Sequence, residues 1–271
     1  MDLNRFFQLL ELELHENKDV AKYHRFANNK DLYHFRKAYL FQRYQFLLNS
    51  ITKPASSILD LGCGYGTTAI LLTLLGHKVH AITLEYYFDE ISSRLKYWSQ
   101  FGDLSSLTFE YRDFFDYSDS DHRFDYIIAI DTLHHIEPIE QCATVLGHLL
   151  TDGGKVIVCE ENGNNIFTRY KHFRERGFKR VSEYFDERLG KKILFGNENT
   201  RPLHQWRSIF KNSELFLEQD SISYIRFFYP AYHNKYSYDE IIQKESLLWK
   251  KYPLLKEYFF FGINFILMKK G

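Results

Sequence analysis

The sequence predicts an α/β fold built on a doubly wound, mostly parallel sheet. From Ser57 onward, short apolar runs alternate with longer stretches of helical periodicity, which is typical of strands connected by helices. The apolar runs are continuous, as expected for strands that helices cover on both faces. The five predicted strands of this region are Ile58–Leu61, Val79–Thr83, Leu107–Tyr111, Tyr126–Ile130 and Val156–Cys159.

The segments around this region predict further elements. Apolar residues at helical spacing predict one N-terminal helix over 3–14 and a second over about 31–51. Two later strands are expected over 216–228 and 259–268, and a charged insertion, which we expect to form a helical cap, occupies 162–201. Ser237 and Glu240 form a capping box at the start of a helix that Pro253 should end.

Length and composition favour one globular domain. The chain has 271 residues, of which 45% are hydrophobic and 26% charged, so it can bury a sizeable core. We divide the single domain, 1–271, into an N-terminal helical cap (1–53), a core (54–161), an insertion (162–201) and a C-terminal part (202–271) with a cap helix near 237–252. Nothing in the sequence indicates an oligomeric state.

Charge and cysteine content bear on partners and location. The 35 Lys and Arg residues balance the 35 Asp and Glu residues, which disfavours the positive field that drives nucleic-acid binding. The three cysteines form neither a CxxC pair nor a disulfide framework, which fits reduced thiols inside a cell. The first residues do not resemble a secretory signal, and no apolar run approaches the roughly 20 residues that span a bilayer. We expect a cytoplasmic protein.

A glycine-rich turn follows the first predicted strand. The segment from Asp60 to Gly66 reads D-L-G-C-G-Y-G and leads into an apolar helix, whose N-terminus offers free N–H groups. Glu85 follows the second strand, about 20 residues downstream, where an acidic side chain binds ribose hydroxyls. The pattern predicts a nucleoside site, although an ordinary strand-to-helix turn is the simpler alternative.

The spacing of the glycines separates this turn from two other nucleotide-binding motifs. A dinucleotide fingerprint requires G-x-G-x-x-G, whereas here the third glycine, Gly66, comes one residue early and Thr67 fills the expected position. The turn also lacks the GK[ST] of a P-loop. Nicotinamide or flavin chemistry and nucleotide hydrolysis are therefore disfavoured.

From Ser57 to Glu160, the chain resembles the class I S-adenosylmethionine-dependent methyltransferases. The glycine turn, the fourth strand with its L-H-H continuation, Leu133–His135, and Gly153-Gly154 carry this resemblance. It implies a Rossmann-like, seven-stranded sheet with an antiparallel last strand, and S-adenosylmethionine as cofactor.

The resemblance also implies roles for particular residues. Asp60 and the backbone of the glycine turn would hold the methionine portion, Glu85 the ribose, and Asp113 with Phe114 the adenine. Asp113 has an alternative role as the cap of a loop. The implied cofactor-binding set is Asp60, Gly62, Cys63, Gly64, Gly66, Glu85, Asp113, Phe114 and Asp131.

Candidate bases follow the fourth and fifth strands. Methyl transfer from a sulfonium is an in-line displacement, which needs a base only when the acceptor carries a proton. Our candidates are His135, Glu161 and His134, and we expect His135 or Glu161 to contact the acceptor. The alternatives are a structural or cofactor-positioning role for the histidines and a loop cap or amine-binding role for Glu160–Asn162.

The position of the additional segments predicts the class of acceptor. Ligands of open α/β sheets bind beyond the carboxyl ends of the strands, where the insertion, the last connection and the N-terminal helices can close a pocket. We therefore expect methylation of an O or N atom of a small-molecule or lipid-like acceptor. The stretch from Phe227 to Tyr232 would supply apolar pocket wall, or pack as core or lid.

Three alternatives have weaker support. The basic run 169–180 could contact RNA or protein, although such a run is more often a solvated helix face. A non-catalytic nucleoside-binding module is a second alternative. Asp131 with Glu161 and Asn162 loosely resembles the Mg²⁺ ligands of some O-methyltransferases, but we predict no metal. Adjacent His134 and His135 cannot share a helical face, which disfavours zinc.

Overall fold

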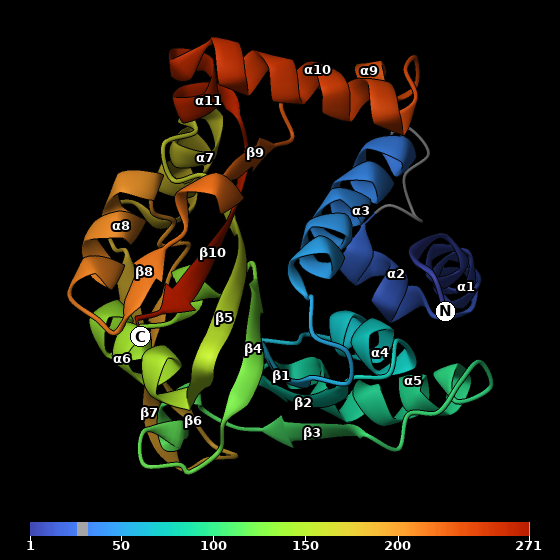
Figure 1. Cartoon of the computed structure of the whole chain (residues 1–271), viewed down its shortest axis with the longest axis vertical. Coiled ribbons are helices and arrows are strands. Elements are labelled where there is room, and N and C mark those ends of the chain that lie inside the picture. The colour runs from blue at the N-terminus through green and yellow to red at the C-terminus, as the bar shows by residue number, and fades with distance from the viewer. Residues whose placement is uncertain (26–31, 271) are drawn as a thin grey trace.

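The computed structural model describes residues 1–25 and 32–270, which form a mixed sheet with helices on both faces (Figure 1). The strand order is β3-β2-β1-β4-β5-β10-β8, with β9 beside β10. Strands β1 to β5 are parallel and β10 is antiparallel to β5, so the predicted fold is confirmed. The strands are β1 Ser57–Leu61, β2 Lys78–Thr83, β3 Leu107–Tyr111, β4 Phe124–Ile130, β5 Leu150–Glu161, β8 Leu215–Leu217, β9 Ser223–Ile225 and β10 Gly262–Lys269.

Two short strands share the seventh position of the sheet. We expected one strand over 216–228, but the 3₁₀ turn η4, Gln219–Ser221, separates β8 from β9. Both strands still pair with β10. At the break, the Ser221 hydroxyl accepts a hydrogen bond from the Ile266 amide at 2.9 Å, so a side chain replaces the missing backbone partner.

The helices form one layer on each face of the sheet (Figure 1). The first layer contains α1 (Leu3–Glu16), α2 (Lys18–His24), α3 (Tyr33–Ser50), α4 (Thr67–Leu74) and α5 (Ile91–Trp98). In it, Trp98 is fully buried and stacks on Phe6 at 4.8 Å between ring centroids. The second layer contains α6 (Ile139–Leu149) and α8 (Leu203–Lys211), whose Trp206 packs near Phe265.

The N-terminal cap contains a helix that we did not predict. Asn17 ends α1 and also starts α2, because its side-chain oxygen accepts hydrogen bonds from the amides of Asp19 and Val20, both at 3.1 Å. Helix α2 has only seven residues, too few for a clear apolar period. The predicted start of the next helix, near Asp31, lies outside the described residues, and α3 begins at Tyr33.

The C-terminal connection follows the predicted start and stop signals. Helix α10 (Tyr238–Lys251) begins with the Ser237–Glu240 capping box, and Pro253 is the first residue of the next helix, α11 (Pro253–Phe259). A single turn, α9 (Pro230–His233), precedes them. Figure 1 shows α10 crossing above the sheet edge toward α3. Within 1–25 and 32–270, every helix is too short or too polar to cross a bilayer.

We expected a helical insertion, but the structure shows that it also contains two strands. Helix α7 (Ile166–Arg176) is followed by a separate antiparallel hairpin of β6 (Val181–Asp186) and β7 (Lys191–Gly196). Much of the hairpin faces solvent, and Lys192 pairs with Glu183 across its strands at 2.8 Å. These exposed charged residues mask the apolar pattern by which strands are predicted from a sequence.

Candidate active site

The glycine turn connects β1 to α4 in a conformation that requires glycine. Gly62 has a φ of 72°, in the left-handed region. A Cβ on Gly62 would lie 2.5 Å from side-chain atoms of Thr132, which follows β4. The turn therefore lies close to the end of the neighbouring strand, as a ligand site at this sheet edge requires.

Asp60, near the end of β1, has a buried carboxylate oxygen without a partner in the described part of the chain. This atom is Oδ2, and the side chain as a whole is also buried. Burial raises the pKa of Asp60 to about 7, with an opposing backbone hydrogen bond from Ala69. Because the residue lines a cavity, a ligand ammonium could satisfy the unpaired oxygen.

The two acidic residues expected to bind the nucleoside line the same cavity. Glu85 follows β2 and is exposed, whereas Phe114 is buried in the wall of the same cavity. Asp113 accepts a hydrogen bond from the amide of Phe115 at 3.2 Å and lies 2.9 Å from the Lys191 ammonium. Asp113 thus caps the 3₁₀ turn Phe114–Tyr117 in this structure, which was the alternative role considered for it.

Asp131, which follows β4, pairs with an arginine of the N-terminal cap. Both carboxylate oxygens accept hydrogen bonds from the Arg43 guanidinium, at 2.5 Å each. Burial opposes ionisation of Asp131, but the charge of Arg43 outweighs it and lowers the pKa. This pair connects helix α3 to the edge of the sheet beside the glycine turn.

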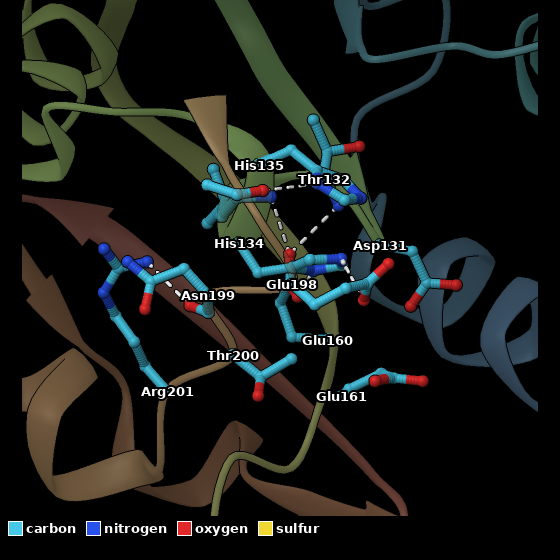
Figure 2. Close-up of polar contacts among 12 residues, drawn as sticks. Asp131, Thr132, His134, His135, Glu160, Glu161, Glu198, Asn199, Thr200 and Arg201 are labelled. Atoms are coloured by element: carbon cyan, nitrogen blue, oxygen red, sulfur yellow. Dashed lines mark hydrogen bonds and ion pairs between the residues drawn. The ribbon is translucent and has the colours of Figure 1, made fainter. Parts of the chain in front are cut away.

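Glu160 organises the turn that contains the two predicted histidines (Figure 2). Its buried carboxylate accepts hydrogen bonds from the amides of Thr132 and Leu133, at 3.0 and 2.7 Å, and contacts His134 Nδ1 at 2.5 Å. Burial lowers the pKa of His134, but the charge of Glu160 outweighs it and raises the pKa to about 9. This geometry favours a positioning role for His134.

His135 contacts the hairpin and also lines the cavity. Its Nδ1 lies 2.9 Å from the carbonyl oxygen of Gly196 at the end of β7. A carbonyl only accepts hydrogen bonds, so Nδ1 carries a proton, and in the neutral imidazole the lone pair is then on Nε2. The imidazole is therefore held in the tautomer that leaves Nε2 as a proton acceptor.

Glu161 lies beside two residues that the sequence analysis did not select. The Nε2 atom of His172, on α7, is 3.4 Å from Glu161 Oε2 and 3.3 Å from Glu198 Oε2. Burial and the charge of Asp131 raise the pKa of Glu161. His172 lies within the basic run 169–180 but, unlike its immediate neighbours, it is buried. This burial, which only the structure shows, distinguishes it from the rest of the run. Nothing in the local sequence distinguishes Glu198.

Of the three oxygen ligands compared with a magnesium site, Asp131 and Glu161 line the same cavity, but Asn162 does not join them. Asp131 bonds to Arg43, and Asn162 turns toward α11. The Asn162 amide nitrogen donates to the carbonyls of Glu257 and Phe260, both at 3.0 Å, while its oxygen accepts from the Asn164 amide at 3.1 Å. Asn162 therefore anchors the chain after β5.

All of the predicted site residues except Gly64 and Gly66 line one cavity of about 1240 Å³. Its wall includes Asp60, Gly62, Cys63, Glu85, Asp113, Phe114, Asp131, His134, His135 and Glu161. Residues of the N-terminal cap and of the hairpin also line it, including Tyr23, Tyr39, Tyr184 and Phe195. Typical sites for one small ligand measure about 300–1,000 Å³, so this cavity has room for a nucleoside cofactor and a second molecule.

This fold and this site define a class I S-adenosylmethionine-dependent methyltransferase. Residues 32–223 match the family described as "Methyltransferase domain", and the chain belongs to this family. The unpaired Asp60 oxygen and the glycine turn fit the charged amine and carboxylate of the cofactor's methionine portion.

Comparisons with known proteins agree with this assignment. An uncharacterised methyltransferase of Staphylococcus carnosus is 29% identical over 124 residues, which are 45% of this chain and 55% of that protein. The match thus spans about half the length of that relative.

Two solved structures share the fold at low identity. Phosphoethanolamine N-methyltransferase 2 of Haemonchus contortus, in complex with S-adenosylmethionine, has a TM-score of 0.53 and 15% identity, over 89% of this chain and 57% of that chain. A Galdieria sulphuraria protein, provisionally assigned as a sarcosine dimethylglycine methyltransferase, has a TM-score of 0.55 and 14% identity, over 87% and 88%.

Proposed function

We propose that this enzyme transfers the methyl group of S-adenosylmethionine to an O or N atom of a small-molecule acceptor. The observation that carries the proposal is the cavity of about 1240 Å³, which joins the glycine turn to His135 and Glu161. The N-terminal helices and the hairpin both contribute to its wall. A small or lipid-like acceptor fits such covering better than a polymer does.

The reaction places few demands on the protein. A lone pair of the acceptor forms a bond to the methyl carbon while the carbon–sulfur bond breaks, and the sulfonium becomes a neutral thioether. An acceptor O–H or ammonium N–H must also lose a proton. His135 Nε2 and the Glu161 carboxylate are the bases that we assign to this proton, because both line the cavity near the end of the sheet.

Two arginines favour an acceptor with an anionic group. Arg36 and Arg226 line the cavity, and the Nε atom of each is buried with no hydrogen-bond partner among the residues described. The guanidinium of Arg226 lies over the rings of Tyr39 and Phe261, at 4.5 and 4.7 Å from their centroids. A carboxylate or phosphate on the acceptor would pair with these partly buried charges.

The test is methyl transfer from isotopically labelled S-adenosylmethionine to a panel of hydroxyl and amine acceptors, with and without an acidic group. We expect labelled product from at least one acidic acceptor. His135→Ala and Glu161→Ala should each lower turnover by at least about tenfold, as is common for a general base. Glu183→Ala, on the exposed side of the hairpin, is the matched control.

Two results would contradict the proposal. Near-normal turnover in both the His135 and the Glu161 variant would remove these residues from the mechanism. Tight cofactor binding without turnover of any acceptor would instead favour a non-catalytic nucleoside-binding module.

A further inference from the structure

Three side chains from distant segments meet at the acceptor side of the cavity. Glu161 ends β5, His172 lies on α7, and Glu198 follows β7. One potential ligand atom from each of the three residues lies within 4.8 Å of the other two. Glu161 and Glu198 also line the cavity.

Hydrogen bonding within the protein does not account for this cluster. His172 is only 1% exposed, yet neither ring nitrogen makes a hydrogen bond to any described residue, and Glu161 Oε2 has none either. Leaving such groups unpaired costs their full desolvation free energy. Polar atoms that are buried, close together and unpaired indicate a missing partner, and two carboxylates with an imidazole call for a cation.

The spacing of the atoms fits a shared metal ion. His172 Nε2 is 3.4 Å from Glu161 Oε2 and 3.3 Å from Glu198 Oε2. Ligand atoms at about 2.0–2.2 Å from one ion, at tetrahedral or octahedral angles, lie roughly 3–3.5 Å apart. The site is closed on the side of His172 and open on the side of the cavity, because the Glu161 and Glu198 side chains are 23% and 37% exposed.

We propose that Glu161, His172 and Glu198 bind one divalent transition-metal ion beside the acceptor. An imidazole with two carboxylates suits Zn²⁺, Mn²⁺ or Fe²⁺, whereas Mg²⁺ prefers oxygen ligands alone. Three protein ligands leave coordination positions open toward the cavity.

The metal would act on the acceptor rather than on the cofactor. An acceptor oxygen in an open coordination position would be oriented, and its proton would pass more easily to His135 Nε2, as metal-bound water loses a proton more easily. With the metal bound, Glu161 would act as its ligand, and His135 would be the base. The oxygen lone pair would then attack the methyl carbon. This role rests on the proposed function, whereas metal binding itself does not.

Metal binding can be measured directly on the full chain. After treatment with a chelator and dialysis, the protein is titrated with Zn²⁺, Mn²⁺ and Mg²⁺ by calorimetry, and the bound metal is counted by elemental analysis. We expect one Zn²⁺ or Mn²⁺ per chain and at least tenfold weaker binding of Mg²⁺. His172→Gln and Glu198→Gln should each weaken binding by more than about tenfold, by comparison with the 10–100-fold losses seen for residues that merely support a ligand.

Glu183→Gln is the matched control, because Glu183 is an exposed carboxylate on the neighbouring hairpin. It should bind metal like the unmodified chain. Circular dichroism and cofactor binding show whether each variant is folded. A Co²⁺ complex whose visible absorption changes in His172→Gln would support imidazole ligation in variants that still bind metal.

The outcomes separate the two proposals. No binding of these ions, or equal binding by the unmodified chain and His172→Gln, would overturn the metal site while leaving methyl transfer intact. Stoichiometric binding that depends on His172 and Glu198, without turnover of any acceptor, would support the site and count against the proposed function.

Discussion

The unpaired oxygen of Asp60 makes cofactor binding sensitive to pH. Burial raises the pKa of this carboxyl to about 7, and a cofactor ammonium would favour its ionised form. Below this pKa, binding must displace a proton, so affinity for S-adenosylmethionine should fall by up to about tenfold per pH unit. We expect weaker binding at about pH 6 than at pH 8 in calorimetric titrations, and little difference for Asp60→Asn.

The same shift has the opposite effect on the stability of the cofactor-free protein. The folded pKa of Asp60 exceeds the ordinary value of 3.8, so the folded state binds more protons than the unfolded state between these values. The free energy of unfolding contributed by this group therefore decreases as pH rises from about 4 to 7. For the binding experiment, equal affinity for S-adenosylmethionine at pH 6 and pH 8 would show that Asp60 does not bind the cofactor ammonium.

Gly64 offers a test of the close packing between the N-terminal cap and the glycine turn. Its φ is 56°, and a Cβ there would lie 2.5 Å from the hydroxyl oxygen of Tyr23. Gly153 has a similar φ of 73°, but a Cβ would meet nothing within 4 Å. Both Gly→Ala variants should lose about 1–2 kcal/mol of stability through the backbone.

Only Gly64→Ala should also displace Tyr23 and distort the cofactor site. We expect its affinity for S-adenosylmethionine to fall by at least about tenfold, with Gly153→Ala close to the unmodified chain. Equal affinities in the two variants would show that the packing of Tyr23 on the turn has no part in cofactor binding.

At the level of elements, a buried ion pair connects helix α1 to the glycine turn. Arg94 on α5 donates to both carboxylate oxygens of Glu13, at 2.7 and 2.6 Å. The same guanidinium donates to the carbonyl of Tyr65 and the hydroxyl of Thr67, at 2.6 and 2.8 Å. The first helix thus supports the cofactor turn through one side chain.

Removing Glu13 should be costly because it leaves a buried charge unpaired. We expect Glu13→Ala to lower the free energy of unfolding by about 3–5 kcal/mol in urea titrations. Glu183→Ala, which breaks the exposed pair with Lys192, should cost less than about 1 kcal/mol. A double variant, Glu13→Leu with Arg94→Met, should recover stability but not cofactor affinity. A loss below 1 kcal/mol in Glu13→Ala would contradict the structural role of the pair.

The elements that the sequence predicts are those with local signals. The buried strands appear as continuous apolar runs, and α10 has its capping box and a following proline. Helix α2 and the β6–β7 hairpin were missed because one is short and the other is half-exposed. The position of Glu85 follows from strand order, whereas Glu198 reaches His172 only through the tertiary packing of the insertion.

At the scale of the whole molecule, the β6–β7 hairpin contacts residues at two ends of the cavity. Tyr111 donates to Asp186 at 2.6 Å and Lys191 pairs with Asp113 at 2.9 Å, beside the expected adenine site. At the other end, His135 contacts the carbonyl of Gly196. These contacts join the hairpin to loops that follow β3 and β4, so ligand binding at those loops should stabilise it.

Hydrogen exchange measured by mass spectrometry tests this coupling. A two-stranded hairpin is marginal alone, so amides of 181–196 should exchange faster than those of β5 and β10 in the cofactor-free protein. Because the cofactor would order the loops that hold the hairpin, S-adenosylmethionine should slow exchange in 181–196 and leave 238–251, which do not line the cavity, unchanged. If the hairpin were already as protected as β5, or if the cofactor slowed α10 equally, the hairpin would be a fixed wall. A hairpin that tightens on cofactor binding would instead close the acceptor end of the cavity only after the methyl donor is in place.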